Sequence, residues 1–369
     1  MIGEDYLLDI IYGRKTGLVP SLIKFCLTLL AQIYRLIIYL RKKVYDWGLK
    51  ESTTLDARVI SVGNITVGGT GKTPLVKRLA LDLEEAGYKV AVLSRGYKGE
   101  FGGEVGVVSD GESILMSPQE AGDEPYLLAQ ALESGAVLVG ASRKETGAYA
   151  CDNFGPDYIL LDDGFQHWQV ERDYDIVALD AVHPFGGAEL LPGGLLREPL
   201  TSLKRADKIV LTRADQVSGE ELEEISTKLE EINVQAEVLL TKHQPTYLRD
   251  LISGQKEAVD IKGERIISAA GIGNPRSFEL TLAELGAQIA KKMRYEDHHS
   301  YTEEDINRLF TLATVHDVDR IITTEKDAVS MDREVIELNN VGIKMQALGI
   351  ELKTLAEDED WQDLLEEVE

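Results

Sequence analysis

Short apolar runs alternate with amphipathic segments along most of this chain. The short runs are typical of buried strands, and the longer segments have the three-to-four-residue spacing of helices. This alternation predicts an α/β fold with a parallel sheet. The runs predicted as strands are residues 59–63, 89–93, 136–139, 158–162, 175–180, 208–212, 265–270 and 288–294, with a hairpin in residues 104–116.

The same pattern predicts how the chain divides. A length of 369 residues suggests two domains, or one large domain with additions. Strands and helices succeed one another from Leu55, the pattern changes around residues 238–247, and it then resumes. We therefore expect a helical segment in residues 1–50, a parallel-sheet domain in residues 51–238 and a smaller α/β domain in residues 239–369. The acidic residues 357–369 are predicted to form a solvated amphipathic helix.

Residues 18–40 form the longest apolar stretch, and Arg41-Lys42-Lys43 follows it. The stretch lacks the position and cleavage site of a secretory signal. Its length could span a bilayer, but Lys24 and Arg35 inside it make spanning costly. An amphipathic helix lying in the membrane interface, with its cations reaching the headgroups, fits better. The alternative is a core helix packed on the protein.

Composition and charge narrow the possible partners. With 44% hydrophobic residues the chain can build full cores, and two cysteines, Cys26 and Cys151, indicate no disulfide framework. The net charge is −25, yet residues 1–50 hold eight Lys and Arg against four Asp and Glu. The acidic body argues against nonspecific binding of nucleic acid. The basic N-terminal segment favours contact with an anionic membrane surface.

A glycine-rich turn follows the predicted strand at residues 59–63. It ends in the run Gly68-Gly69-Thr70-Gly71-Lys72-Thr73-Pro74. Glycines allow successive N–H groups to turn toward an anion. Lys72 supplies a charge for the outer phosphates, and the Thr73 hydroxyl can ligate Mg²⁺. A helix from Thr73 to about residue 86 directs the positive end of its dipole at the phosphates.

One position departs from the motif G-x-x-x-x-G-K-[ST], because Thr66 stands where the first glycine belongs. A chance glycine turn before a helix is the alternative interpretation. Strand, loop, Lys72–Thr73 pair and helix nevertheless occur together and in order. They predict a phosphate-binding loop and therefore a P-loop NTPase-like sheet domain.

Polar residues gather where predicted strands end. Asp162 and Asp163 close the strand that begins at residue 158, the place where a P-loop protein has its Mg²⁺-organising aspartate. Paired acids there are otherwise common turn formers. Gln166 and His167 come just after them, and either line the site or are plain loop residues. Arg95 follows the strand at residues 89–93 and is a candidate phosphate clamp or a solvated loop arginine.

Two further positions have candidate chemistry. Asp123 is placed to cap a helix at its N-terminus, and its carboxylate could also accept a proton from a hydroxyl. His298 and His299 adjoin each other without acids at metal-ligand spacing, so a catalytic or polar-contact role is open. The run Thr212–Asp215 loosely matches a base-reading loop of nucleotide-binding proteins. The long Gly/Pro-containing loop at residues 184–199 is predicted to be ordered near the site or the membrane.

These motifs occur in the order of one family. They are Asn64–Pro74, Ser94–Tyr97, Gly122–Pro125, Asp162–His167, Leu191–Pro199, Leu211–Asp215, Gly271–Pro275, Asp297–His298 and Thr324–Asp327. In residues 10 to 330 the chain closely resembles the tetraacyldisaccharide 4′-kinases, the lipid A 4′-kinases. The resemblance includes Thr66 in the loop. Residues after Met331 carry no motif of this kind.

The resemblance implies a lipid kinase that moves the γ-phosphate of ATP, with Mg²⁺, to the 4′-hydroxyl of an acylated glucosamine disaccharide 1-phosphate. It implies a peripheral or monotopic enzyme on the cytoplasmic face of the inner membrane, with an anionic membrane surface as partner. No nucleic acid and no obligate protein partner is expected. The competing class is a P-loop GTPase or ATPase switch acting on a protein partner, and a scaffold without chemistry is a third.

The resemblance also implies roles for single residues. It puts the general base at Asp123, with His298 as the partner that tunes or orients its carboxylate. Gly68 to Thr73 bind the nucleotide. Thr73, Asp162, Asp163 and Glu198 are the residues implied for Mg²⁺ and the substrate site. Arg95, Gln166 and His167 are implied to line the substrate site.

Overall fold

A computed structural model describes residues 4–11, 14–232, 234–339, 342–356 and 359–368. The chain forms two compact units, each assembled from separated stretches of sequence. Unit 1 consists of Met1–Lys72, Asp157–Lys242 and Thr354–Glu369, and unit 2 consists of Thr73–Pro156 and His243–Lys353. The domain boundaries expected at residues 50 and 238 stay predictions.

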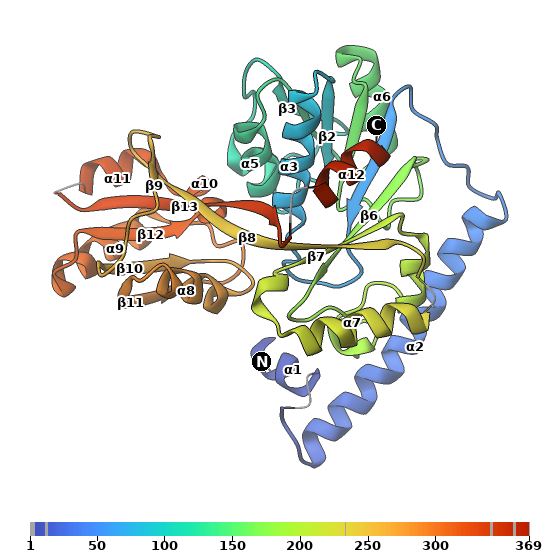
Figure 1. The fold of residues 1–369 in the computed structure, drawn as a ribbon, viewed down its shortest axis with the longest axis horizontal. Coiled ribbons are helices and arrows are strands. Elements are labelled where there is room, and N and C mark those ends of the chain that lie inside the picture. Colours follow the sequence, from blue (N-terminus) through green and yellow to red (C-terminus); the bar gives the residue numbers. More distant parts are fainter. Residues whose placement is uncertain (1–3, 12–13, 233, 340–341, 357–358, 369) are drawn as a thin grey trace. The chain divides into compact units, whose positions relative to one another are not determined.

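Unit 1 contains a parallel sheet (Figure 1). Its strands are β1 (Arg58–Gly63), β5 (Tyr158–Asp162), β6 (Tyr174–Asp180), β7 (Lys208–Thr212) and the first part of β8 (Glu237–Asp250). They lie in the order β5-β1-β6-β7-β8, and every neighbouring pair is parallel. Because all these strands run the same way, their carboxyl ends share one edge, where α/β sheets bind ligands.

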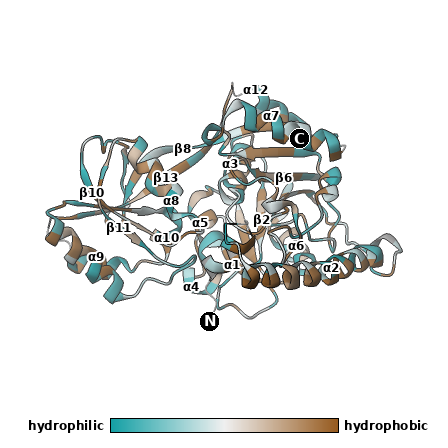
Figure 2. Cartoon of the chain, turned by 90° about the horizontal axis from the view of Figure 1, so that it is seen from below, coloured by the Kyte–Doolittle hydropathy of each residue, from teal (hydrophilic) through white to brown (hydrophobic). Residues whose placement is uncertain are grey.

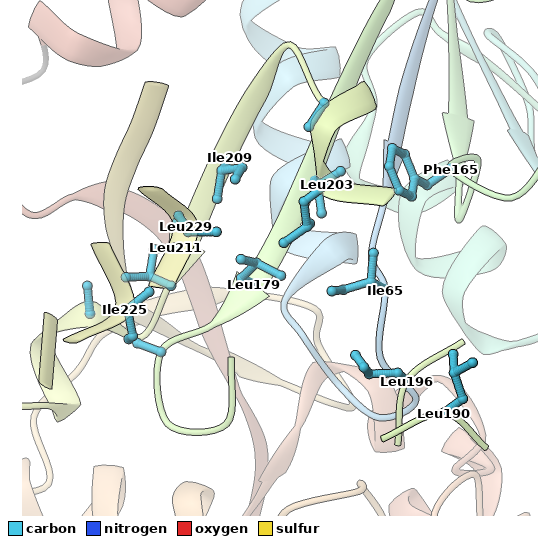
Figure 3. Close-up of a cluster of buried hydrophobic side chains, with 14 of the residues drawn as sticks. Ile65, Phe165, Leu179, Leu190, Leu196, Leu203, Ile209, Leu211, Ile225 and Leu229 are labelled. Carbon is cyan, nitrogen blue, oxygen red and sulfur yellow. The ribbon is translucent and has the colours of Figure 1, made fainter. Parts of the chain in front are cut away.

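A cluster of buried apolar side chains fills the core of unit 1 (Figure 3). Val177 and Leu179 of β6, with Ile209 and Leu211 of β7, contribute to it and are at most 1% exposed. The helix α7 (Gly219–Ile232) adds Ile225 and Leu229 to the same cluster. Burial of these alternating and helical apolar positions is what the sequence pattern predicts.

The N-terminal helices belong to unit 1. They are α1 (Glu4–Ile11) and α2 (Leu18–Asp46), a helix of 29 residues that contains the apolar stretch. Figure 2 shows hydrophobic residues along much of α2. By length and composition α2 could cross a membrane, and only 6% of its most apolar window is buried in the protein. The interpretation of this stretch as a core helix is therefore wrong.

Unit 2 holds two groups of strands. In the first, β2 (Val90–Ser94) pairs in parallel with β4 (Ala136–Val139), and β3 (Gly106–Asp110) pairs antiparallel with β4. In the second, β10 (Arg265–Ala270), β11 (Gln288–Arg294), β12 (Arg320–Thr324) and β13 (Lys344–Thr354) form the parallel order β11-β10-β12-β13. The short β9 (Lys256–Ala258) pairs with the later part of β8.

Helices connect the strands of unit 2. They are most of α3 (Lys72–Glu85), α4 (Pro118–Ala121), α5 (Asp123–Ala131), α6 (Arg143–Phe154), α8 (Pro275–Glu284), α9 (Glu303–His316), α10 (Glu325–Val329) and α11 (Arg333–Asn339). Several of these helices begin at side-chain caps. Asn274 caps α8 through Ser277, and Thr302 with Asp305 forms a capping box at α9.

The predicted mixed α/β class, the parallel sheet and the apolar N-terminal helix are confirmed. The C-terminal segment corrects one detail. The helix α12 (Glu359–Val368) is amphipathic as predicted, but it is not simply solvated, since Trp361, Leu364 and Val368 are fully buried. Its Glu367 also accepts hydrogen bonds from Lys208 on β7. The tail is therefore an integral part of unit 1.

Candidate active site

The glycine-rich loop joins the end of β1 to the start of α3, as predicted. Asn64 and Thr70 are buried, and the Asn64 amide donates a hydrogen bond of 2.9 Å to the Thr70 hydroxyl. This bond ties the two ends of the loop together. Gly68 and Gly71 have φ values of 111° and 79°, which favour glycine. A Cβ added at Gly68 or Gly69 would meet nothing within 4 Å, so the backbone there faces open space.

Two residues at the end of β7 hold this loop. The Thr212 hydroxyl donates to the Thr70 carbonyl at 3.0 Å, and the Arg213 guanidinium donates to the Gly69 carbonyl at 3.0 Å. Arg213 is also ion-paired with Asp180 at the end of β6. The comparison with a base-reading loop did not anticipate this arrangement. Thr212 is fully buried and Arg213 is 8% exposed, and both side chains contact the loop backbone.

The end of β5 lies against the end of β1. A Cβ at Gly63 would come within 2.7 Å of the backbone nitrogen of Phe165. Only glycine allows this close approach, which brings the turn after β5 beside the phosphate loop. The turn itself places Asp163 in the left-handed region with φ 56°. Aspartate tolerates that conformation better than most residues.

Asp163 is the anionic centre of the loop region. Its carboxylate lies 3.4 Å from the Lys72 ammonium and accepts hydrogen bonds of 2.7 and 3.0 Å from Arg197. Burial raises the pKa of this carboxyl, but the charges of Lys72 and Arg197 outweigh burial and lower the pKa to about 2. Asp163 is therefore ionised at neutral pH, and it positions the Lys72 ammonium next to the loop.

This ion pair predicts a pH-dependent stability. A carboxyl with a lowered folded-state pKa stabilises the fold above its unfolded pKa of about 3.9 and loses that effect as the pH falls toward 2. We expect Asp163→Asn to lower the melting temperature at pH 7, with a difference from wild type that shrinks between about pH 4 and pH 2. Asparagine also tolerates the left-handed backbone. Thermal unfolding at pH 7, 5, 4 and 3 measures this, and a difference that stays constant would contradict it.

Glu198 and Gln166 form a second cluster in unit 1. Glu198 is 2% exposed and accepts two hydrogen bonds from Arg205, at 2.8 and 3.0 Å. The Gln166 amide donates to Glu198 at 3.0 Å and to the Asn64 carbonyl at 2.9 Å. The carbonyl of His167 accepts a hydrogen bond from Arg172. Gln166 thus links the turn after β5 to the start of the phosphate loop.

The acids predicted for Mg²⁺ occupy different environments. Asp162 is 3% exposed at the end of β5, whereas Asp163 and Glu198 are each paired with arginine. Within the described residues, no group of three or more His, Cys, Asp and Glu side chains could hold a metal ion.

The loop between β6 and β7 is ordered and touches both the phosphate loop and α2. Val67 donates its backbone N–H to Leu195, and Arg197 donates its own to Ile65. On the other side, Lys24 of α2 donates to the Gly193 carbonyl at 2.8 Å. The prediction that this loop is ordered is confirmed, and its contacts link α2 to the phosphate loop.

Unit 2 brings together Asp123 and His298, which are 175 positions apart in the sequence. The Asp123 carboxylate lies 3.2 Å from Nδ1 of the His298 ring. Their side chains are 20% and 11% exposed. The Tyr97 ring packs edge-on against His298, with the ring centroids 5.5 Å apart. Because both side chains are held and partly accessible, the carboxylate can receive a proton while the ring orients it.

The predicted capping role of Asp123 is wrong. The N-cap of α5 is Gly122, with φ 89°, and Asp123 is the first residue of the helix itself. A side chain at position 122 would meet the carbonyl of Tyr97, because the added Cβ comes within 2.8 Å of that oxygen. Glycine therefore occupies the cap, and the Asp123 carboxylate faces His298 instead.

Arg95, at the end of β2, is exposed.

The sequence analysis did not identify the cations that contact the candidate site residues of unit 1 and unit 2. Arg197, Arg205 and Arg213 hold carboxylates or the loop backbone in unit 1. Lys326 contacts His298 in unit 2. The available signal was position for Arg197, Arg213 and Lys326, since each lies within a motif named above, whereas Arg205 lies outside those motifs. Their partners, however, come from distant parts of the chain.

Together, the parallel sheet, the glycine-rich loop after β1 and the lysine at the start of α3 define a P-loop nucleotide-binding protein. Residues 23–369 match the family model described as tetraacyldisaccharide-1-P 4′-kinase. The chain therefore belongs to the tetraacyldisaccharide 4′-kinase family.

Individual relatives agree with this assignment. The chain is 42% identical to the tetraacyldisaccharide 4′-kinase of Halothermothrix orenii, a match that covers 95% of this chain and 94% of that protein. It is 44% identical to the enzyme of the same name from Syntrophus aciditrophicus over 81% of this chain and 82% of that one. A crystal structure of LpxK from Aquifex aeolicus in complex with ATP is similar, with 29% identity and a TM-score of 0.73, over 94% of this chain and 99% of that one.

Proposed function

We propose that this protein transfers the γ-phosphate of ATP to the 4′-hydroxyl of a tetraacyl glucosamine disaccharide 1-phosphate, a step of lipid A biosynthesis. The observation that carries the proposal is the match of residues 23–369 to the kinase family. The structure of a relative in complex with ATP supports ATP as the phosphate donor. The alternative, a switch that acts on a protein partner, loses its support because Thr212 and Arg213 contact the loop backbone.

The chemistry proposed for each cluster follows from its residues. Phosphoryl transfer depends mainly on positioning and on neutralising charge. The loop amides of Gly68 to Thr73 and the Lys72 ammonium bind the phosphates, and Arg95 is a further candidate cation. Asp123 accepts the proton of the acceptor hydroxyl while the hydroxyl oxygen bonds to the γ-phosphorus. At the same time, the bond between the γ-phosphorus and the β–γ bridging oxygen breaks. His298 orients the Asp123 carboxylate. ADP is the leaving group.

Mg²⁺ is part of the proposal. The donor set fits a hard cation, because Thr73 offers a hydroxyl and Asp162 a buried carboxylate at the end of a strand. When bound, the ion would neutralise charge on the transferring phosphate. Asp163 and Glu198 would contribute near the ion by positioning the cations with which they are paired, Lys72 and Arg205. Gln166 and His167 are proposed to line the acceptor side.

The test is a transfer assay with the full chain in detergent. Protein, γ-labelled ATP and Mg²⁺ are incubated with and without the acylated disaccharide 1-phosphate, and label is followed into lipid. Label that enters lipid only when the acceptor is present supports the kinase. Label released as free phosphate whether or not lipid is present would favour the switch, and GTP would then be compared with ATP.

We also propose that α2 binds the membrane that holds the acceptor. Apolar residues spaced by three or four positions form one outward face of the helix. They are Leu18, Leu22, Phe25, Leu29, Ile33, Leu36 and Leu40, between 48% and 92% exposed. The opposite face contacts unit 1 through Ala31, which is buried, and through Lys24, which pairs with Glu189 at 3.3 Å.

This arrangement changes the role expected for one cation. Lys24 was counted as a charge facing the membrane, but it is paired on the protein side of α2. Arg35 and Lys42 are exposed and remain available to headgroups. Arg41 is also exposed but donates a hydrogen bond of 3.4 Å to the Gln166 carbonyl. An interfacial helix with an apolar face and flanking cations supports a peripheral or monotopic protein. Since the acceptor is a lipid and the donor is ATP, the cytoplasmic face of the inner membrane is the proposed location.

Replacing apolar residues on the outward face tests the membrane proposal. We expect the double variant Leu22→Glu and Phe25→Glu to bind vesicles containing anionic phospholipid at least tenfold more weakly, since each buried apolar side chain contributes about 1.5–3 kcal/mol. ATP binding should not change, because both side chains are more than 60% exposed. Vesicle co-sedimentation and ATP titration measure the two effects.

A matched control is Val315→Glu, at an exposed apolar residue of α9 that is 72% exposed. It should leave vesicle binding unchanged. Equal loss of vesicle binding in both proteins would mean that general surface charge, not α2, is responsible. Parallel loss of vesicle and ATP binding in the double variant would show that the segment is structural.

A further inference from the structure

Lys326 is a charged residue beside the Asp123–His298 pair that the proposed chemistry leaves without a role. It lies on α10, the short helix after β12, within the run Thr324–Asp327. Its ammonium is 3.0 Å from Nε2 of His298, the ring nitrogen that does not face Asp123. The imidazole is therefore held between a carboxylate on one nitrogen and an ammonium on the other.

The surroundings of Lys326 centre on the same pair. Its ammonium lies 3.1 Å from a carboxylate oxygen of Asp297 and 3.7 Å from one of Glu124. Glu124 and Asp297 adjoin Asp123 and His298 in the sequence. The Lys326 side chain is 21% exposed, and the two acids partly balance its charge. The ammonium is thus kept at the imidazole and not drawn away to solvent.

The helix that carries Lys326 is firmly attached to unit 2. Asp327 is 3% exposed and accepts hydrogen bonds from the Gly271 N–H at 2.9 Å and the Tyr301 hydroxyl at 3.1 Å. The neighbouring Glu325 accepts a hydrogen bond of 2.5 Å from Tyr247. His298 is fixed by the same glycine, because its backbone N–H donates to the Gly271 carbonyl at 3.0 Å. Lysine and histidine are therefore positioned by one rigid junction.

We propose that Lys326 is a positioning residue that sets the tautomer of His298. An ammonium group has three donors and no acceptor, so Nε2 of His298 must accept its hydrogen bond. In the neutral ring the proton then resides on Nδ1, which donates to the Asp123 carboxylate. The opposite tautomer would direct a lone pair at that carboxylate and an N–H at the ammonium, and both contacts would be repulsive.

The inference rests on the proposed function of Asp123 as the base. A carboxylate that accepts a hydrogen bond from Nδ1 through one oxygen keeps its other oxygen for the acceptor hydroxyl. The wrong tautomer would break this contact and let the carboxylate rotate. Lys326 therefore acts on the chemical step through His298, without touching either substrate.

Kinetics of Lys326 variants test the role. We expect Lys326→Met to lower kcat by roughly tenfold, a fraction of the 10²–10⁴ that general base catalysis supplies, and to leave the KM for ATP within about twofold. Lys326→Arg retains a charged donor and should restore most of kcat. The control Lys344→Met removes a lysine of unit 2 that pairs with Glu257 on the surface, and it should behave as wild type.

A direct measurement separates this inference from the proposed function. With ¹⁵N-histidine labelling of the full chain in detergent, the ring nitrogen shifts report which nitrogen carries the proton. The chain has six histidines, and His298→Gln identifies the signal of interest. We expect an Nδ1-protonated ring in the wild-type protein and a shift toward the Nε2-protonated form in Lys326→Met.

Each outcome bears on one claim. An Nε2-protonated His298 in the wild-type protein would overturn the inference whatever the activity, and so would wild-type kcat in Lys326→Met. Loss of kcat that Lys326→Arg does not restore, with the tautomer unchanged, would also overturn it. A wild-type protein with the expected tautomer but no acceptor-dependent transfer would instead refute the proposed function.

Discussion

Asp123→Ala is expected to lower kcat for transfer to lipid by about 10²–10⁴, the usual contribution of a general base. The acceptor hydroxyl must lose its proton as it bonds to phosphorus, and the Asp123 carboxylate lies 3.2 Å from the His298 imidazole in unit 2. ATP binding should be unchanged because the phosphate loop does not depend on this side chain. Steady-state transfer assays and ATP titrations on the purified variant measure both quantities.

The same assays compare the effect of replacing Asp123 with the effect of replacing His298. His298→Ala should cost less than Asp123→Ala, because it leaves the base in place but unoriented. Glu112→Ala, at an exposed acidic residue of unit 2, is the control and should retain wild-type kcat. If Asp123→Ala kept turnover within about twofold of wild type while ATP still bound, Asp123 could not be the general base.

Much of the fold could be predicted because the local signals in this chain agree with the final structure. Buried strands such as β1 and β5 are largely apolar runs, and their burial on both faces is what a parallel sheet demands. The caps at Asn274 and Thr302 are equally local, because each side chain closes the first turn of its own helix. These features depend on residues three or four positions apart, so the sequence displays them directly.

The misjudged residues are those whose partners lie far away in the chain. Asp123 has the residue type of an N-cap, but its carboxylate faces a histidine 175 positions later. The charges of the acidic C-terminal helix dominate its local pattern and predict a solvated helix, whereas Trp361 is buried. Short-range propensity cannot reveal such contacts, since the fold itself creates them.

The candidate site shows the same division. The loop glycines and Lys72 could be found from spacing alone, because a phosphate loop is a local structure. Arg213 could not, since its contacts with Gly69 and Asp180 depend on the order of β1, β6 and β7 in the sheet. The strand order therefore supplies the residues that support the loop. The motif supplies the loop residues that are proposed to bind phosphate.

Lys72→Met is expected to reduce the rate of transfer by about a hundredfold to a thousandfold, the effect of removing one preorganised group that stabilises developing charge. The ammonium lies beside the loop and is positioned by Asp163, 3.4 Å away. Nucleotide binding should weaken as well, because the lysine charge acts on the ground-state phosphates. ATP titration and the transfer assay measure the two effects. Lys228→Met, which removes an exposed lysine of α7, is the control.

The structure also separates a binding role for Lys72 from a purely structural one. Asp163 keeps its contact with Arg197 when Lys72 is replaced, so the fold should survive the change. Ligand binding to the folded state raises the melting temperature. ATP should therefore raise the melting temperature of the wild-type protein and of Lys228→Met, but not that of Lys72→Met. An undiminished ATP-dependent rise in Lys72→Met would show that Lys72 stabilises the Asp163 turn and does not bind phosphate.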